Sequence, residues 1–364
     1  MPVRLLAHHD LGGYGDGMQV LREGDALYVG HFGISGMGTS ILDVSDPSAP
    51  RLVEQWPAPP GTHTHKVQVA DGLLLVNEEQ FRAGAGHRAG LVVYDLEEPL
   101  HPRQLGRLET GGLGVHRIVW TGGRYAHASA TPDGFADRIW IVIDLDDPEH
   151  PVEAARWWLD AEQPPGRRYA AHHALLDGSV AYLGYGDAGM VVLDVREITR
   201  PIELARLDWE PGGDTHTCLP LPGRGLVVVT DEQVVEGAAE PRFVRVVDVA
   251  DPVRPRVVGV FPEPERRHAD LRFGPHNLHE NRPGSYRSER YVFVTYFSAG
   301  LVVYDLENPA APRVTAHWQP AAPPGQAAPQ TNDAFVDADG YVWLTDRLTG
   351  GLYVLDRFVI LSDQ

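Results

Sequence analysis

The sequence has little sulfur and little basic charge. It contains one cysteine, Cys218, among 364 residues, so no disulfide can form within the chain, as is typical of a reducing compartment. Lysine and arginine number 31 against 50 aspartates and glutamates, a formal net charge of −19. Nucleic-acid backbones and anionic membranes repel such a chain. We therefore expect neither nucleic acid nor a membrane as a partner.

Long hydrophobic runs are also missing. No apolar segment approaches the ~20 residues that cross a bilayer, and the first residues show no signal-peptide pattern. The sequence therefore predicts a cytoplasmic protein. It has no P-loop, no Gly-x-Ser-x-Gly, no Cys-x-x-Cys and no Gly-x-Gly-x-x-Gly opening a helix. Neither a nucleotide cofactor nor a serine nucleophile is supported.

What the sequence does have is a unit that recurs seven times. An apolar strand ends in aspartate, and in most copies a proline follows within a few residues. Successive aspartates are spaced by 52, 49, 50, 54, 57 and 51 residues. A near-constant period of this length fits a four-stranded propeller blade better than a helical repeat. The seven residues are Asp43, Asp95, Asp144, Asp194, Asp248, Asp305 and Asp356.

This period predicts an all-β chain, a single domain over residues 1–364 that forms a seven-bladed β-propeller. Residues 3–8 match the fourth strand of a blade, so we expect them to complete the last blade, close the ring and remove an exposed sheet edge. The aspartates recur in every blade and are expected to bind turn backbone rather than substrate. The predicted blades span about 14–58, 62–110, 114–159, 169–210, 214–262, 273–318 and 330–360.

The repeated unit of apolar strand, aspartate and proline resembles the LVIVD-repeat family. That resemblance covers nearly the whole chain and implies a β-propeller, but it implies little about activity. A looser similarity to selenium-binding protein/methanethiol oxidase is carried by the Asp-Pro turns and by His63-Thr64-His65. It implies a copper centre and makes a metal-dependent oxidase one option.

Histidines fall on one register of the repeat. The first strand of each propeller blade lines the central channel, and the second strand returns antiparallel to the same face. The predicted start positions of the first strands are Asp16, His65, His116, His172, His216, His276 and Asn332. The predicted end positions of the second strands are His31, Glu78, Ser129, Tyr185, Asp231, Tyr296 and Asp346. Every one of these residues is polar, which packing alone does not require.

We interpret the five histidines as ligands of a transition metal ion near the axis, since neutral imidazole suits such metals. Fe, Cu, Mn and Zn all remain open. Carboxylates commonly orient ligating histidines, and Glu78 and Asp231 are the predicted candidates. An all-histidine shell backed by carboxylates resembles the iron site of the carotenoid-cleavage oxygenases. The predicted ligands are His65, His116, His172, His216 and His276.

Several assignments stay open at this level. Tyr185 and Tyr296 could serve as acid–base groups or fill the pore by stacking. The histidines could instead line a channel that binds an anion or a polar ligand without metal. A one-residue register error would exchange His172 with His173, because successive strand side chains point to opposite faces. Cys218 is either a thiolate ligand or, as its apolar equivalents in other blades favour, a core residue.

The predicted function is a metal-dependent enzyme acting on a small organic molecule, with oxidation or oxygenation favoured. One alternative is a redox-silent lyase, isomerase or hydrolase that uses its metal as a Lewis acid. The other is a non-catalytic propeller that binds a protein through rim arginines, for which the loops offer Arg266, Arg267, Arg287 and Arg290. The sequence specifies neither the substrate nor the oligomeric state.

Overall fold

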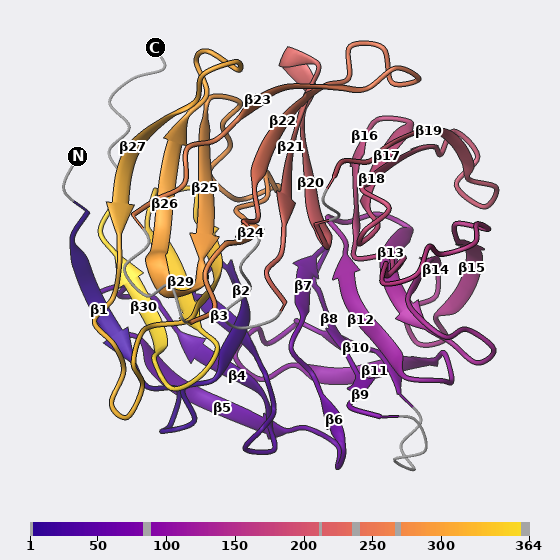
Figure 1. Cartoon of the computed structure of the whole chain (residues 1–364). Helices are drawn as coiled ribbons and strands as arrows, with labels where there is room; N and C mark the ends of the chain where they lie inside the picture. The colour runs from indigo at the N-terminus through magenta and orange to yellow at the C-terminus, as the bar shows by residue number, and fades with distance from the viewer. Residues whose placement is uncertain (1–2, 83–88, 211–212, 235–240, 266–270, 358–364) are drawn as a thin grey trace.

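The computed structural model describes residues 3–82, 89–210, 213–234, 241–265 and 271–357. These residues form seven antiparallel sheets arranged around a common centre (Figure 1), as the repeat predicts. Helix is limited, in the described part of the chain, to two 3₁₀ turns, η1 (Pro222–Arg224) and η2 (Phe297–Ala299). None of the helices found there is long and apolar enough to cross a membrane.

The strands follow the chain blade by blade, from the centre outward. The first three blades contain β2 (Gly17–Glu23), β3 (Ala26–His31), β4 (Met37–Asp43) and β5 (Arg51–Pro57); β7 (Val67–Ala70), β8 (Leu73–Asn77), β10 (Gly90–Asp95) and β11 (Arg103–Glu109); and β12 (Gly114–Val119), β13 (Tyr125–Thr131), β14 (Ile139–Asp144) and β15 (Val152–Trp157).

The next three blades contain β16 (Ala174–Asp177), β17 (Val180–Gly184), β18 (Met190–Asp194) and β19 (Ile202–Leu207); β20 (Thr215–Leu221), β21 (Leu226–Asp231), β22 (Val244–Asp248) and β23 (Arg256–Val260); and β24 (Pro275–Leu278), β25 (Tyr291–Tyr296), β26 (Gly300–Asp305) and β27 (Arg313–Trp318). The last blade contains β28 (Thr331–Val336), β29 (Val342–Asp346), β30 (Gly351–Leu355) and β1 (Leu5–His9).

The two ends of the chain meet in that last blade. Strand β1 pairs antiparallel with β30, with Leu5 opposite Leu355 and His9 opposite Leu352. The prediction that the N-terminal strand completes the seventh blade is confirmed. Residues 358–360 of the predicted blade lie outside the described residues.

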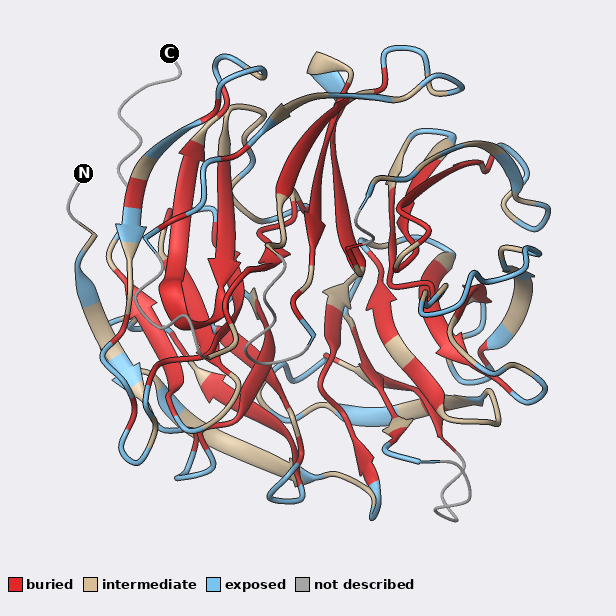
Figure 2. Cartoon of the chain, in the orientation of Figure 1, coloured by how far each residue is buried: buried red, intermediate tan, exposed pale blue. Residues whose placement is uncertain are grey.

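The hydrophobic core lies between neighbouring sheets rather than at the axis. Each core cluster draws on adjacent blades, as where Trp343 of β29 packs with residues of the first blade such as Tyr28. Figure 2 shows buried inner strands and partly exposed outer strands. Because the apolar residues pack between the blades, the axis is left to polar side chains.

Turn chemistry explains the sharp corners of the blades. Asp71 and Gly72 both adopt positive φ, 46° and 73°, which matches the two-residue hairpin that an Asp-Gly pair favours. Six of the seven recurring aspartates accept a backbone N–H group of the following turn, for example Asp43 from Ser45 at 2.9 Å and Asp305 from Glu307 at 2.9 Å, and Asp356 accepts that of Arg357. Their predicted structural role is confirmed.

One element departs from the simple blade pattern. Strands β6 (Thr62–His63) and β9 (Glu79–Gln80) leave the second blade and extend the sheet of the third, where Glu79 pairs with Gly114. The predicted blade 62–110 is therefore divided between two sheets. This excursion positions His63 and Glu79 beside the first strand of the third blade.

Closure of the ring generates the first prediction. Gly351 begins β30 with φ 74°, and a Cβ there would lie 2.3 Å from the backbone oxygen of His9. We expect Gly351→Ala to lower the free energy of unfolding by about 3 kcal/mol. Gly24→Ala is the matched control, because Gly24 has φ 57° with open space around it, and about 1 kcal/mol is expected. Chemical denaturation would measure both, and equal losses would contradict the closure argument.

Candidate metal centre

The candidate ligands are placed by irregularities in the innermost strands. In β12 the pairing skips from Val115 to Arg117, and in β20 it skips from Thr215 to Thr217. The residue left between is His116 in one case and His216 in the other. A β-bulge of this kind re-aims the extra side chain and is common beside functional sites. The bulge turns these imidazoles out of the blade and toward the axis.

Each bulge is braced by the neighbouring blade. Asn77 Nδ2 donates to the carbonyl oxygen of Val115 at 2.7 Å, beside the His116 bulge. Thr230 Oγ1 donates to the carbonyl oxygen of His276 at 2.9 Å. In the fourth blade the equivalent residue is Gly184, where a Cβ would lie 2.5 Å from the backbone of His216. Inter-blade packing therefore holds the histidine backbone in place.

The five predicted histidines converge. Their rings follow one another around the axis, with centroid separations of 5.0 Å from His65 to His116, 5.2 Å to His172, 3.5 Å to His216 and 4.6 Å to His276. Five residues spread over about two hundred positions of the chain thus line one cavity of about 190 Å³. The predicted convergence is confirmed.

Burial keeps these imidazoles neutral. It lowers the pKa of His65, His172, His216 and His276 well below the usual range, with further lowering from neighbouring cations or imidazoles. For His116, burial lowers the pKa to about 4 even though Glu79 acts to raise it. Neutral imidazole is the form that ligates a metal.

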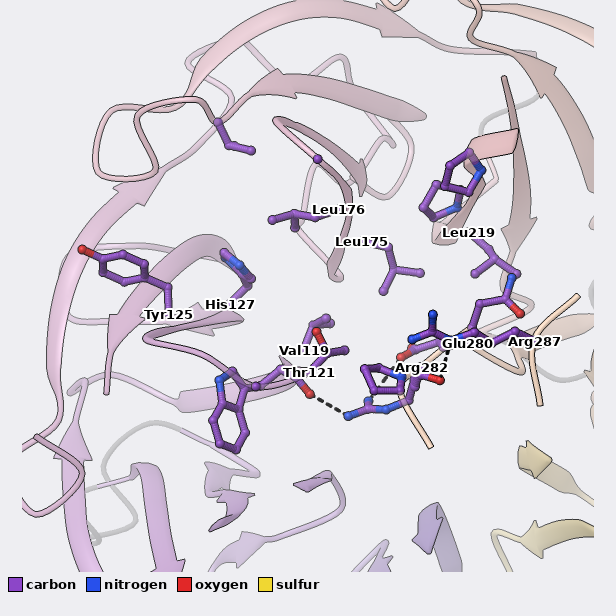
Figure 3. Close-up of a pocket in the computed structure, with 18 of the residues that line it drawn as sticks. Val119, Thr121, Tyr125, His127, Leu175, Leu176, Leu219, Glu280, Arg282 and Arg287 are labelled. Carbon is purple, nitrogen blue, oxygen red and sulfur yellow. Dashed lines mark hydrogen bonds and ion pairs between the residues drawn. The ribbon is translucent and has the colours of Figure 1, made fainter. Parts of the chain in front are cut away.

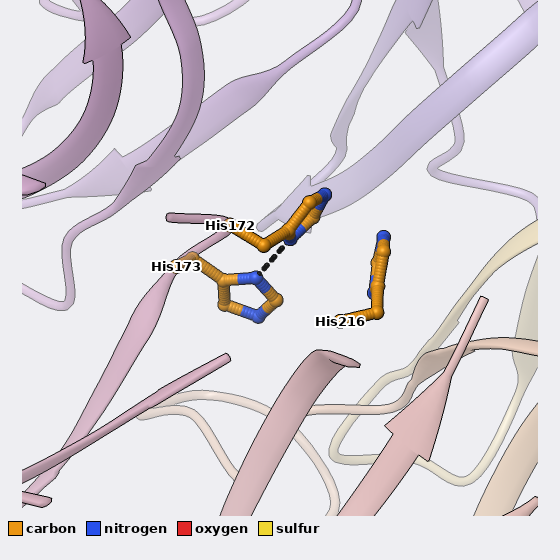
Figure 4. Close-up of side chains that lie close together, drawn as sticks. All are labelled: His172, His173 and His216. Carbon is orange, nitrogen blue, oxygen red and sulfur yellow. Dashed lines mark hydrogen bonds between the residues drawn. The ribbon is translucent and has the colours of Figure 1, made fainter. Parts of the chain in front are cut away.

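Among the described residues, three groups of side chains place their potential ligand atoms within 4.8 Å of one another. The first is a cluster of three histidines (Figure 4), in which Nδ1 of His172 lies 2.6 Å from Nδ1 of His173. The other two each combine two imidazoles with one carboxylate. The groups are His172, His173 and His216; His63, His65 and Glu79; and His216, Glu232 and His276.

In the group of His216, Glu232 and His276, the hydrogen bonds define which nitrogen of His276 carries the lone pair. His276 Nδ1 donates to the carbonyl oxygen of Asn332 at 2.7 Å, so its neutral ring carries a lone pair on Nε2. That Nε2 lies 3.5 Å from Glu232 Oε1, and His216 Nε2 lies 3.8 Å from Glu232 Oε2. Burial raises the pKa of Glu232, but the neighbouring His216 and the guanidinium groups of Arg272, Arg347 and Arg138 lower it to about 2. A lone pair and a carboxylate that face one another suit a cation between them.

A second carboxylate fixes other histidines. Glu79 Oε2 accepts from His63 Nε2 and from His116 Nδ1, each at 2.7 Å. His116 therefore presents its Nε2 lone pair to the cavity. His65 differs, because Asn77 Nδ2 lies 3.2 Å from its Nδ1 and donates to it, which leaves the proton on Nε2. In this arrangement His65 is a donor rather than a ligand.

The predicted carboxylates are corrected by one residue. Glu78 forms an ion pair with Arg107 of β11, and Asp231 forms one with Arg245 of β22. Neither lines the cavity of the histidines. The residues that contact the histidines are the next ones along the chain, Glu79 and Glu232, because successive strand side chains point to opposite faces.

The predicted tyrosines lie in the core between blades. The Tyr185 hydroxyl accepts from the backbone N–H of Leu159 at 3.0 Å, and burial raises its pKa to about 12. The Tyr296 hydroxyl lies 3.2 Å from that of Tyr304, and burial raises its pKa well above the usual range. Neither residue lines the cavity, so we assign them no catalytic role.

The structure also places three other residues. Met18, not Asp16, occupies the place in β2 that corresponds to the histidines and lines the cavity, while Asp16 accepts from His31 Nδ1 at 2.6 Å. Cys218 is fully buried among apolar residues, as its apolar equivalents predicted. His279 donates to the carbonyl oxygen of Tyr286 and lies in the core.

Comparison with known proteins finds one repeat family that matches parts of the chain and several structures of similar fold. A family model for the LVIVD repeat matches residues 15–56 and 288–317. The chain carries LVIVD repeats. No curated protein matches this sequence.

Solved structures share the architecture of this propeller at low sequence identity. A Lactobacillus plantarum protein has a TM-score of 0.63 and 11% identity, over 92% of this chain and 100% of that one. Chaetomium thermophilum Raptor scores 0.61 at 11% identity, and the chain spans only 29% of its length while 97% of this chain is covered. The computationally designed Ika8 protein scores 0.53 at 12% identity, with coverage of 96% and 89%. These likenesses concern the fold alone.

Sequence reasoning missed the cations of the cavity. Lys66 follows His65 directly and is the only lysine in the chain. This rarity is the feature of the sequence that could have pointed to it. Lys66 lines the cavity and is 2% exposed. Burial lowers its pKa to about 7, with a further contribution from Arg117. The cavity is also lined by Arg138, Arg168, Arg272 and Arg347.

Charged side chains close the channel behind the histidines. Glu280 accepts from Arg117 Nη2 at 2.6 Å and lies 3.5 Å from His173 Nε2. Beyond this network lies a second cavity of about 730 Å³ with both apolar and polar walls, lined by residues such as Leu175, Leu219 and Arg287 (Figure 3). Because Glu280 also lines that cavity, the charged network separates the two spaces.

The buried histidines generate a prediction on pH. We expect the free energy of unfolding to fall as pH is lowered from 6.5 to 5, because imidazoles neutral in the fold become protonated on unfolding. Each contributes up to about 1.4 kcal/mol per pH unit. Burial raises the pKa of Asp214 and Asp333 to about 6, and these two carboxyls offset part of the effect.

A control variant distinguishes a change in the pH dependence of stability from a general loss of packing. Burial lowers the pKa of His127, outside the histidine cavity, to about 4. His127→Asn should make the profile shallower by about one histidine's share, whereas substitution of the exposed His101 should leave the slope unchanged. Denaturation midpoints from pH 5 to 8 would measure this, and a flat wild-type profile would contradict it.

Proposed function

We propose that the chain is a metal-dependent enzyme that acts on a small organic molecule, with oxidation or oxygenation as the favoured reaction. The supporting observation is the group of His216, His276 and Glu232, in which two neutral imidazoles and an ionised carboxylate face one another. Two histidines and one carboxylate with open positions are typical of non-haem iron(II) oxygenases. When bound, such an ion supplies redox chemistry at an open coordination position.

The chain's own residues would prepare this site in three ways. The Asn332 carbonyl oxygen fixes the tautomer of His276, an outer-shell role that commonly tunes a ligand. Arg272 pairs with Glu232 and orients its carboxylate. Burial excludes bulk water, which strengthens the interaction of these groups with charge.

Measurement of the bound metal also distinguishes two alternative functions. A zinc or manganese ion in this group would favour Lewis-acid chemistry in a lyase, isomerase or hydrolase. A protein-binding propeller would use exposed arginines of the rim. Arg287 is exposed, whereas Arg266 and Arg267 lie outside the described residues. That alternative leaves the convergent histidines unexplained, and a cytoplasmic location remains our prediction.

Metal content tests the proposal. Protein purified without a histidine tag should hold about one transition-metal ion per chain by elemental analysis, and iron or copper would favour the redox reaction. His276→Ala and Glu232→Gln should each lower metal affinity by about 100-fold or more, because each removes a ligand. His101→Ala, at an exposed position, is the matched control. Metal-free protein that cannot be reconstituted under anaerobic conditions would contradict the proposal.

Removal of the metal gives a separate readout on stability. A ligand bound only to the folded chain stabilises it by about 4 kcal/mol at 1,000 times its dissociation constant. Chelator should therefore lower the melting temperature of the wild-type protein and leave Glu232→Gln nearly unchanged. An equal effect of chelator on both proteins would show that the stabilising ion binds elsewhere.

A further inference from the structure

The histidine cavity carries a charge opposite to that of the chain. The whole sequence has a formal net charge of −19, yet five cationic side chains line this cavity. The acidic residues that line it are Asp214 and Glu232. The cationic residues are Lys66, Arg138, Arg168, Arg272 and Arg347.

Two of these cations are neutralised within the protein. Arg168 forms a bidentate pair with Asp137, at 2.6 and 2.7 Å. Arg272 pairs with Glu232. The other three, Lys66, Arg138 and Arg347, take part in no ion pair within the part of the chain that the structure describes.

The contacts of these three residues leave their charged ends available. Lys66 is 2% exposed, and within the described ranges its ammonium group has no hydrogen-bond partner. Arg138 Nε donates to the carbonyl oxygen of Ala171 at 3.1 Å, which leaves the terminal nitrogens of its guanidinium. Arg347 lies over the ring of Phe32, 4.8 Å from its centroid.

Buried cations without a direct ion-pair partner are costly, because carboxylates at a distance, such as Glu232, replace only part of the lost hydration. A metal ion does not remove this cost, since it adds positive charge to the same cavity. An anion does remove it. The cavity of about 190 Å³ is smaller than a typical drug-sized pocket, so the anion must be small.

We propose that the cavity binds a small oxyanion, a carboxylate or phosphate group, through Lys66, Arg138 and Arg347. This identification of the substrate class rests on the proposed function, whereas the anion site itself depends only on the cations that form no ion pair with the described residues. The bound group lies between these cations and the histidines. The substrate is thus a small carboxylic acid or phosphate ester whose anionic end is held while its remainder faces His216 and His276.

Calorimetric titration of the intact chain tests the site. Inorganic phosphate and acetate are the probes, at constant ionic strength set with chloride, before and after treatment with chelator. We expect saturable binding of at least one probe, and a loss of about tenfold or more in Lys66→Met and in Arg347→Gln, because each removes a charge-assisted hydrogen bond. Arg103→Gln, an exposed arginine paired with Asp95 at 3.1 Å, changes net charge equally and should bind as wild type does.

Stability separates a binding role from a structural one. Lys66→Met keeps the shape of the side chain and removes an unpaired charge, so the melting temperature should stay the same or rise without anion. Anion should raise the melting temperature of the wild type more than that of the variant. No binding of either probe, or equal binding by Lys66→Met, Arg347→Gln and wild type, would overturn the inference.

The two proposals fail differently. Anion binding by a chain that holds no metal would leave the oxyanion site standing and remove the metal-dependent enzyme. Stoichiometric metal without anion binding would leave the enzyme standing and remove the oxyanion site.

Discussion

The arrangement of this molecule depends on how each innermost strand begins. In β12 and β20 the strand bulges there, one residue is left unpaired, and its side chain, His116 or His216, turns toward the axis. The neighbouring blade braces the bulge, by a hydrogen bond from Asn77 or Thr230 or by the close approach that Gly184 permits. Because each brace comes from the preceding blade, packing between adjacent blades fixes the histidines.

The electrostatics of the cavity follow from that placement. Burial and mutual repulsion keep the imidazoles neutral, while Glu79 and Glu232 remain ionised beside them. Lys66, Arg138 and Arg347, which form no ion pair with the residues that the structure describes, share the same space. A region that holds neutral donors, a carboxylate and unbalanced positive charge is suited to an ion pair of metal and oxyanion. A metal ion alone, or an oxyanion alone, would interact with only some of these groups.

The sequence predicted the fold and much of the site because both follow from periodicity. The spacing of the recurring aspartates indicated seven blades, and the N-terminal strand at 3–8 indicated how they close. The register also brought His65, His116, His172, His216 and His276 together, because the first strands of all blades face one axis.

The rest depends on irregularities that a regular alternation cannot represent. Strand β9 leaves its own blade for the third, which brings Glu79 rather than Glu78 beside the histidines. The chain that follows Asp231 likewise brings Glu232 there in place of Asp231. In β2 the bulge shifts the equivalent position from Asp16 to Met18. Tyr185 and Tyr296 carry polar hydroxyl groups, but their side chains are buried between sheets. Nothing in the sequence distinguished Lys66 except that it is the single lysine.

The central claim is that the axis holds a metal at His216, His276 and Glu232. Anomalous diffraction measured at the absorption edge of the metal found in the purified protein tests it most directly. The account predicts one strong anomalous peak within coordination distance of these three side chains. A peak elsewhere, or none at the axis of crystals that retain the metal, would contradict it.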